Sequence, residues 1–144
     1  MTPDELAESC ANAMWAKDAA SKWIGMERIS THAGRAEIVL EITEKHTNGH
    51  GTCHGGVIFA LADSAFAFAC NSRNQATVSQ HNIITYISPA RIDDRLSAVA
   101  SETSLTGRNG IYDVRVTNQN NDLIAEFRGF SRAINARVIP KETP

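Results

Sequence analysis

The stretch from Gly55 to Cys70, GGVIFALADSAFAFAC, limits most strongly what this chain can fold into. Between Val57 and Cys70 its only polar residues are Asp63 and Ser64. Its alanines favour a helix over a strand, and a helix that is apolar on all sides is a buried one. The sequence therefore predicts a long buried helix over residues 55–70.

The rest of the chain predicts mainly strands. Residues 3–19 predict a first helix, with Pro3 in its first turn, and the polar, glycine-containing residues 44–54 predict a loop. Alternating patterns predict strands at 35–43, 77–87, 95–105, 111–118 and 123–134. Asn109-Gly110 predicts a hairpin turn between two of these strands, and residues 118–122 predict another turn.

One buried helix against an antiparallel sheet is an α+β architecture. One sheet covers only part of a helix that is apolar all round. We therefore expect a second copy of the chain to cover the remaining side.

Length and composition narrow the classes of function. A chain of 144 residues holds one domain, and its formal net charge of −2 excludes a strongly basic nucleic-acid binder. It has no uncharged apolar run of the length that spans a membrane, and its first residues lack the pattern of a signal peptide. Three scattered cysteines do not form a disulfide framework. A protein of the reducing cytoplasm is the simplest expectation.

Asp63 is the first candidate for chemistry. An ionised carboxylate among apolar neighbours is costly unless it is paired or hydrogen-bonded, and burial raises its pKa, which suits a general base. The structural alternative is that Asp63 caps a backbone amide or pairs with a basic residue. The sequence leaves both interpretations open.

The second candidate is His54-Gly55-Gly56, directly before the apolar run. Free amides at a helix start can hold an oxyanion, although the motif also fits a plain loop-to-helix junction. Gly55 and Asp63 are eight residues apart, which is roughly 12 Å along a helix. One carbonyl cannot reach both, so a site that uses both has to be shared between two antiparallel helices of a dimer.

Other polar residues have competing interpretations. Asn48 could bind a water or the substrate, or serve the turn at Asn48-Gly49. Ser79 and His81 are two apart on a predicted strand, so we expect them to share a face and either line the pocket or satisfy the sheet. His46, His50 and His54 are four apart, but the glycines between them argue against a helix, so we predict no metal site.

Taken together, these motifs resemble the hotdog-fold acyl-CoA thioesterases of the PaaI type, which belong to phenylacetate degradation. HTNGHGTCHGGVIFALADSAFAFACNS (46–72) is similar to the family signature, and ITYISPA (84–90) and RNGIYDV (108–114) also fit. The resemblance covers about residues 10–135. It implies a single hotdog domain over residues 1–144, with a core of about 20–137: a long helix wrapped by a curved antiparallel sheet, preceded by an N-terminal helix.

The resemblance also implies an activity and roles for residues. It implies thioester hydrolysis without a metal or cofactor, coenzyme A being part of the substrate, in a homodimer with shared sites that pairs into a tetramer. Asp63 would act as general base or nucleophile, the Gly55 amide would polarise the carbonyl, and Asn48, His54 and Ser79 would orient the thioester and the water. The residues implied around the substrate and coenzyme A are Gly56, Tyr86, Arg91, Arg108, Asn109 and Gly110.

The sequence leaves the acyl group open. The resemblance favours phenylacetyl-CoA or a ring-hydroxylated relative; medium- or long-chain fatty acyl-CoA is the alternative, and a non-enzymatic acyl-CoA sensor is another. A hydratase is disfavoured because residues 55–70 contain no histidine. Phe59, Phe66 and Phe68 are candidates for an aromatic acyl pocket or for the core. His50 has no assigned role, and Arg91, Arg95, Arg108 and Arg132 could meet phosphates or simply be solvated.

Overall fold

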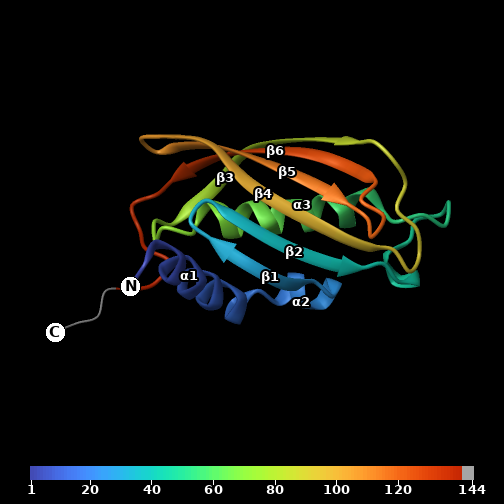
Figure 1. Cartoon of the computed structure of the whole chain (residues 1–144), viewed down its shortest axis with the longest axis horizontal. Coiled ribbons are helices and arrows are strands. Elements are labelled where there is room, and N and C mark those ends of the chain that lie inside the picture. Colours follow the sequence, from blue (N-terminus) through green and yellow to red (C-terminus); the bar gives the residue numbers. More distant parts are fainter. Residues whose placement is uncertain (141–144) are drawn as a thin grey trace.

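A six-stranded antiparallel sheet curves around one central helix, α3 (Figure 1). The computed structural model describes residues 1–140; the last four residues of the predicted domain lie outside them. The strand order is β1-β2-β4-β5-β6-β3. The helices are α1 (Pro3–Lys17), α2 (Ala19–Ile24), the short 3-10 helix η1 (Glu44–His46) and α3 (Gly55–Cys70); the strands are β1 (Glu27–His32), β2 (Arg35–Glu41), β3 (Thr77–Tyr86), β4 (Arg95–Thr106), β5 (Asn109–Thr117) and β6 (Leu123–Ala133).

The predicted buried helix forms over the expected residues. His54 caps its N-terminus and Asn71 its C-terminus. Half of its side chains are buried, and they pack against the inward faces of the strands: Ile58, Leu61, Ala62, Ala65, Phe66, Phe68, Ala69 and Cys70. The α+β hotdog fold is thus confirmed. Within residues 1–140, no helix is both long and apolar enough to cross a membrane.

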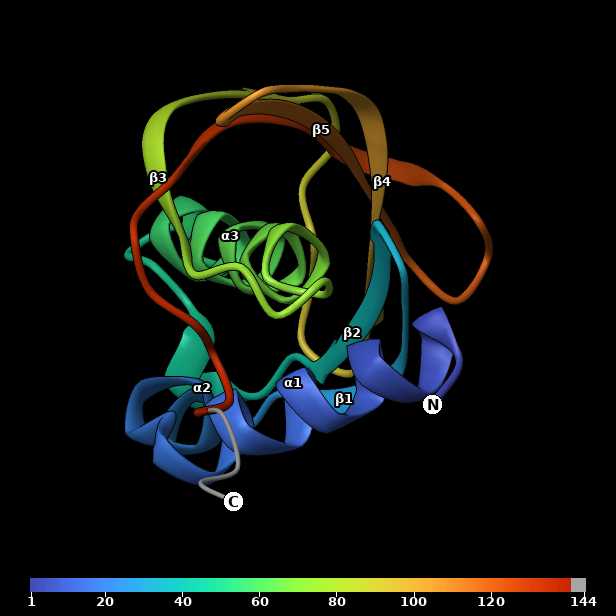
Figure 2. The same ribbon diagram turned by 90° about the vertical axis from the view of Figure 1, so that its left-hand side faces the viewer.

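The sheet does not enclose α3 completely. Viewed along the helix, the sheet runs from β3 over β5 and β4 to β2, and residues 1–140 place no strand between β3 and α2 (Figure 2). A stripe of α3 is accordingly left uncovered or only partly covered, at residues three or four apart. Gly56 at its start is exposed, and Phe59, Ala60, Asp63 and Ala67 are partly buried. β3 is the edge strand beside this open side.

The N-terminal prediction was partly wrong. The predicted helix 3–19 is interrupted at Asp18, whose side chain accepts a hydrogen bond from Ser21 N–H at 2.9 Å and so starts α2. Gly25 then ends α2 in the left-handed conformation at φ +104°. The edge strand β1 that follows was not predicted, because its residues ERISTH are mostly polar and give little alternation.

The predicted hairpin between β4 and β5 exists, but its turn lies two residues earlier. Thr106 pairs with Asn109, so the loop residues are Gly107 and Arg108. Gly107 has φ +61°, as the first central residue of a type II′ turn requires. Gly110 serves packing instead, since a Cβ there would lie 2.5 Å from Ser131 Oγ. The turn at Asn118 is confirmed, with its side chain accepting from Asn120 and Asp122 N–H.

The expectation that Ser79 and His81 share a face was wrong. Ser79 pairs with Ser131, and His81 pairs with the adjacent residue Phe130, because Gln80 forms a β-bulge. Directly paired residues point to the same face of a sheet, and neighbours along a regular strand point to opposite faces. Ser79 therefore lies on the inner face with the buried Ser131, while His81 stacks on Phe130 outside, with ring centroids 5.4 Å apart.

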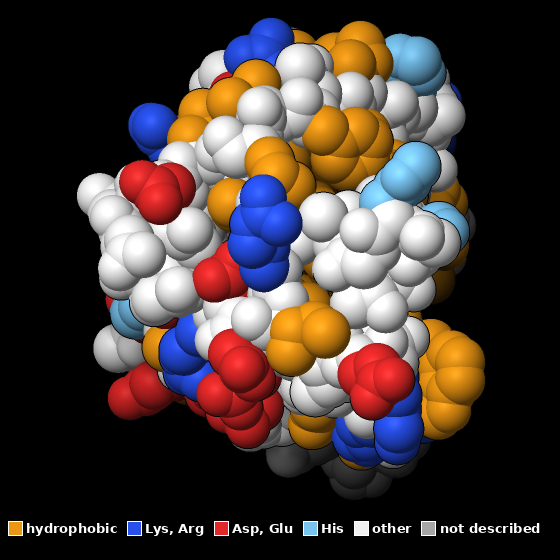
Figure 3. All heavy atoms as spheres, turned by 90° about the vertical axis from the view of Figure 1, so that its right-hand side faces the viewer, with side chains coloured by type: hydrophobic (Ala, Val, Ile, Leu, Met, Phe, Trp, Pro, Cys, Tyr) orange, Lys and Arg blue, Asp and Glu red, His pale blue; other side chains and the backbone are white. Residues whose placement is uncertain are grey.

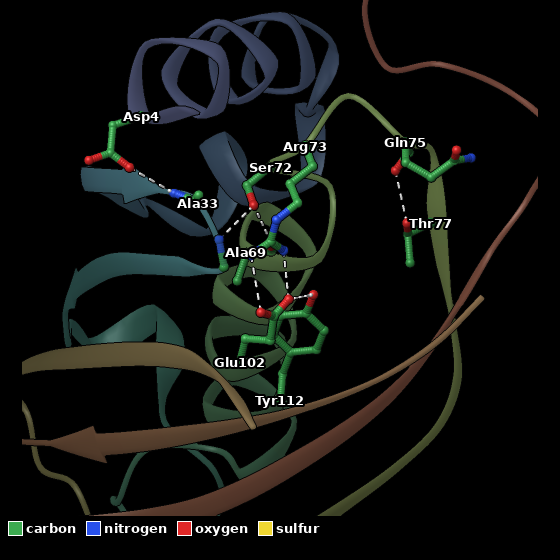
Figure 4. Close-up of polar contacts among 10 residues, drawn as sticks. Asp4, Ala33, Ala69, Ser72, Arg73, Gln75, Thr77, Glu102 and Tyr112 are labelled. Carbon is green, nitrogen blue, oxygen red and sulfur yellow. Dashed lines mark hydrogen bonds and ion pairs between the residues drawn. The ribbon is translucent and has the colours of Figure 1, made fainter. Parts of the chain in front are cut away.

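The C-terminal end of α3 is tied to the sheet by a small polar network (Figure 4). Arg73 donates to both carboxylate oxygens of Glu102, at 2.6 and 3.1 Å, and the buried Tyr112 hydroxyl donates to Glu102 at 2.9 Å. Ser72 Oγ accepts from Gly34 N–H at 2.8 Å. Burial alone raises the pKa of Glu102, but the bonds from Arg73 and Tyr112 outweigh it and hold the pKa below its ordinary value.

We expect Glu102→Gln to lower the free energy of unfolding at pH 7 by about 1–2 kcal/mol, because it leaves the Tyr112 hydroxyl and Arg73 with a weaker acceptor. A carboxylate with a lowered folded pKa stabilises above its unfolded pKa and loses that contribution as the pH falls. Denaturation at pH 7 and pH 3 should therefore show the difference shrinking in acid. Glu126→Gln, whose exposed partner Arg115 is 3.9 Å away, is the matched control and should cost less than about 0.5 kcal/mol. Equal costs for the two variants would contradict this account.

Candidate functional site

The first turn of α3 leaves one backbone amide available. His54 Nδ1 accepts from Gly56 N–H at 2.8 Å, and His54 O accepts from Val57 and Ile58 N–H. Among residues 1–140, no acceptor meets Gly55 N–H. Because Nδ1 of His54 accepts, its neutral ring carries the hydrogen on Nε2 as a further donor. The helix N-terminus thus offers the Gly55 amide where the dipole favours negative charge.

Gly55 is a glycine because another side chain packs on it. Tyr86, at the end of β3, donates its hydroxyl to Gly55 O at 2.8 Å. A Cβ on Gly55 would lie 3.2 Å from both the hydroxyl and the ring of Tyr86, while the backbone of Gly55 is not in the positive-φ region. The close approach of Tyr86, and not an unusual backbone angle, therefore accounts for this residue.

Asp63 lies in the middle of α3 on the partly open stripe. Burial raises its pKa, and a hydrogen bond from Asn82 Nδ2 to Oδ1, 3.4 Å long, acts in the opposite direction. Among the ion pairs of the described residues none involves Asp63. The structural alternative of a basic partner therefore finds no support in residues 1–140. A half-buried carboxylate with a raised pKa is an arrangement suited to accepting a proton.

Asn82 was missed by the sequence analysis. Its side chain connects two residues that were singled out, since Ser79 Oγ donates to Asn82 Oδ1 at 3.0 Å. On a regular strand, residues 79 and 82 would point to opposite faces, so no pattern in the sequence indicated the contact. The bulge at Gln80 brings both to the inner face.

The polar loop before α3 is organised by its own side chains. Asn48 Oδ1 accepts from His50 N–H at 2.9 Å and Thr52 N–H at 3.3 Å, and Nδ2 donates to Thr52 Oγ1 at 3.2 Å. The structure thus places Asn48 in the turn, as its alternative interpretation held. His50 is exposed on the same loop.

His46 is a structural clamp. Its Nδ1 accepts from Thr43 N–H at 2.9 Å, and its Nε2 lies 2.7 Å from Ile24 O, so both ring nitrogens are used. In the described part of the chain, no group of three His, Cys, Asp or Glu side chains is arranged to hold a metal ion.

The residues expected to meet coenzyme A fall into two groups at opposite ends of α3. Tyr86 lines a pocket with Gly55, and Arg91 lines the adjoining one. Arg108 lines a pocket beside Cys70, the last residue of the helix. A 16-residue helix spans roughly 24 Å, so one chain does not bring the groups together. The Gly55 end mixes hydrophobic, charged and histidine side chains on its surface (Figure 3).

The three candidate phenylalanines divide between core and site. Phe66 and Phe68 are fully buried, so they belong to the core. Phe59 is half-buried on the open stripe, one turn before Asp63, and packs edge-on against Phe127. A separate cavity of about 500 Å³ lies against the first turn of α3, with Trp23, Ile24, Val39 and Val57 among its lining residues.

Comparison with known proteins points to one family. The family model described as Thioesterase superfamily matches residues 50–125. The chain is 38% identical over 128 residues to acyl-coenzyme A thioesterase PaaI of Escherichia coli (strain K12), covering 89% of this chain and 91% of the relative. The solved structure of E. coli PaaI, from the phenylacetic acid degradation operon, superposes with a TM-score of 0.93 at 37% identity over 94% of this chain and 99% of that one. The TT0310 protein from Thermus thermophilus gives a TM-score of 0.79 at 34% identity, over 82% and 99% of the two chains.

We expect Asp63→Asn to raise the free energy of unfolding at pH 7.5. A folded pKa above the unfolded value of 3.8 means that folding disfavours the ionised form, so the native protein is penalised as the pH rises through that window, and asparagine carries no such penalty. Thermal unfolding at pH 7.5 and pH 4 should show a gain that diminishes in acid. The exposed Glu41→Gln should show no such pH-dependent gain. A variant less stable than the wild type at pH 7.5 would contradict the raised pKa of Asp63 in the folded protein.

Proposed function

Since the chain belongs to the thioesterase superfamily and is an acyl-CoA thioesterase, we propose that it hydrolyses aryl-acetyl CoA thioesters, such as phenylacetyl-CoA or a ring-hydroxylated relative, to the free acid and coenzyme A. The observation that carries the proposal is a pair of groups on one helix: the Gly55 amide without an acceptor in residues 1–140 and the Asp63 carboxylate with a raised pKa. An enzyme of this activity leaves no need for the non-enzymatic sensor interpretation.

The two groups fit the two demands of the reaction. Attack on the thioester carbonyl forms a C–O bond and places negative charge on the carbonyl oxygen, which the Gly55 N–H stabilises. In one version Asp63 takes the proton of the attacking water, the C–S bond breaks, and the leaving thiolate of coenzyme A takes up that proton. In the other version Asp63 attacks directly, the C–S bond breaks and the thiolate leaves; water then hydrolyses the acyl–Asp63 anhydride to the free acid. His54, through Nε2–H, together with Asn48 and Ser79, would orient the thioester and the water. No metal or cofactor takes part in this scheme.

The spacing of residues supports a site shared by two subunits. Gly55 touches Tyr86, and Asp63 touches Asn82, so β3 runs antiparallel to α3 alongside it. Eight helical residues span roughly 12 Å, and four strand residues span roughly 13 Å. A two-fold axis through Ile84 would therefore place Tyr86 opposite Asn82 of the partner subunit, and with it Gly55 beside Asp63 of the partner subunit.

The edge of β3 has the hydrogen-bonding pattern for this pairing. Ile87 N–H donates to Ile124 O on the β6 side, and antiparallel strands alternate the direction of these groups. Asn82, Ile84 and Tyr86 should therefore direct N–H and C=O toward the free edge. The stripe of α3 beside it is mostly small and apolar, as a close helix pair needs.

The same dimer would unite the two groups of coenzyme A residues. With the axis through Ile84, the segment Tyr86–Arg91 passes the start of β3 of the partner subunit, where Thr77 and Arg108 line one pocket. The Arg108–Gly110 hairpin and the Tyr86–Arg91 segment would then border one groove. A further pairing of dimers gives the proposed tetramer, and the cytoplasmic location stays a prediction.

The preference for an aryl group rests on Phe59 and on the likeness to PaaI. Phe59 lies one turn before Asp63 on the open stripe, where a phenyl ring attached one carbon from the carbonyl could stack on it. The cavity lined by Trp23, Ile24, Val39 and Val57 favours the second candidate, a medium- or long-chain fatty acyl group, because about 500 Å³ accommodates an alkyl chain.

A thiol-release assay with a panel of acyl-CoAs tests the activity and the acyl group. We expect turnover of phenylacetyl-CoA by the wild type and a loss of about 10²–10⁴-fold in kcat/KM for Asp63→Asn. Phe59→Leu should reduce the preference for aryl-acetyl over aliphatic substrates. Turnover of aliphatic chains alone, sensitive to Trp23→Ala, would replace the aryl proposal with the fatty-acyl one. Near-normal turnover by Asp63→Asn would contradict the mechanism.

Mixing two inactive variants tests whether the site is shared. Gly55→Pro removes the N–H at a helix position where proline is tolerated, and Gly55→Ala is its control, because both add a Cβ against Tyr86 but only alanine keeps the amide. Gly55→Pro should lose far more activity than Gly55→Ala. Random pairing of co-expressed Gly55→Pro and Asp63→Asn subunits makes half of the dimers mixed, and each mixed dimer contains one intact site of two. The mixture should therefore recover roughly a quarter of wild-type activity. No recovery in dimers shown to be mixed would place both groups in one subunit.

A further inference from the structure

We propose that Asn82 is a positioning residue for Asp63, and that the β-bulge at Gln80 places it there. The inference rests on the proposed function, in which Asp63 is the reacting carboxylate, and it goes further by assigning a role to a residue that neither the sequence motifs nor the comparisons single out. Asn82 reaches no reacting atom in this scheme and acts only through Asp63.

The bulge decides which side chains of β3 can meet. Ser79 pairs with Ser131, and after the extra residue Gln80 the register resumes with His81 opposite Phe130 and Asn82 opposite Gly129. Ser131 and Gly129 are two apart on β6 and share its inner face. Ser79 and Asn82 therefore lie side by side over α3, although three residues separate them in the chain.

The sheet approaches the helix closely at this point. A Cβ on Gly129 would lie 2.7 Å from the ring of Phe66, so only glycine fits between β6 and α3. Phe66 is three residues after Asp63 on the same helix. The close approach brings the neighbouring Asn82 within hydrogen-bonding distance of Asp63, at 3.4 Å.

The two hydrogen bonds that link Ser79, Asn82 and Asp63 fix the orientation of the Asn82 amide. Ser79 Oγ donates to Asn82 Oδ1, which leaves Asn82 Nδ2 to donate to Asp63 Oδ1. The reversed amide would put its oxygen against the carboxylate. Asp63 Oδ1 is thus engaged as an acceptor, and Oδ2 is left for the reacting water or carbonyl.

The contact opposes the effect of burial on Asp63. Burial favours the neutral carboxyl, whereas a donor to Oδ1 favours the ionised form that both versions of the mechanism require. From β3 the group that faces Asp63 is the neutral Asn82 amide. On α3, the thiol of Cys70 interacts electrostatically with Asp63. Burial raises the pKa of this thiol most, and the charge of Asp63 raises it further, to about 12, so the thiol stays uncharged.

The test is the pH profile of kcat/KM for Asn82→Ala and Asn82→Asp. Asn82→Ala removes the hydrogen-bond donor to Asp63 and should lower kcat/KM about tenfold at neutral pH. The acid limb, the fall of kcat/KM at low pH as Asp63 becomes protonated, should move to higher pH. Asn82→Asp keeps the shape but places a like charge beside Asp63, so its acid limb should move further in the same direction. Thr85→Ala, on the outer face of the same strand, is the control and should leave the profile unchanged.

A double-mutant cycle separates positioning from structure. If Asn82 acts through Asp63, adding Asn82→Ala to Asp63→Asn should not lower the residual activity further. An unchanged profile for Asn82→Ala beside an inactive Asp63→Asn overturns the role of Asn82 and leaves the proposed function standing. The role of Asn82 is also overturned if Asn82→Ala lowers the rate without shifting the acid limb and lowers it equally in the Asp63→Asn background. An active Asp63→Asn removes the proposed function and this inference together.

Discussion

Covering helix α3 is the requirement on which the rest of the structure depends. Its apolar side chains face in every direction, and the transfer of such a surface out of water is the main favourable term in folding. The curved sheet covers most of the circumference, and α1 and α2 extend the cover below β1 and β2 (Figure 2). One stripe beside the edge strand β3 stays only partly covered, and it carries Asp63, which Asn82 of β3 contacts.

A partly covered carboxylate is a compromise between stability and reactivity. Asp63 carries a raised pKa because burial disfavours its charge, and in the described residues a single neutral amide from Asn82 is the contact that opposes this effect. The strongly paired carboxylates lie elsewhere, for example Asp113 against Arg128 and Glu102 against Arg73, where the pKa is held low. Asp63, by contrast, is a half-buried carboxylate in the middle of the central helix, and it has no basic partner among residues 1–140.

The edge strand and the helix act as one functional unit. Tyr86 contacts Gly55 at the start of α3, and Asn82 contacts Asp63 at its midpoint. The distance along β3 from Tyr86 to Asn82 therefore matches the distance along α3 from Gly55 to Asp63. In the proposed pairing, with the two-fold axis through Ile84, a second copy that continues the sheet at β3 would also bring its Gly55 to Asp63. The proposed dimer and the proposed active site therefore follow from one geometric relation.

The sequence by itself determined the buried helix and the class of fold, because both depend on local pattern. It also singled out Gly55 and Asp63 and predicted a partner subunit from their distance along one helix, and these stay predictions. It did not determine the break at Asp18, the polar edge strand β1, the turn at Gly107 or the placement of Asn48, which depend on particular hydrogen bonds and packing contacts. Only the tertiary structure separated Phe59 from the core residues Phe66 and Phe68. It also put His81 outside and Asn82 inside, because a single extra residue in β3 reverses the alternation from which a sequence is interpreted.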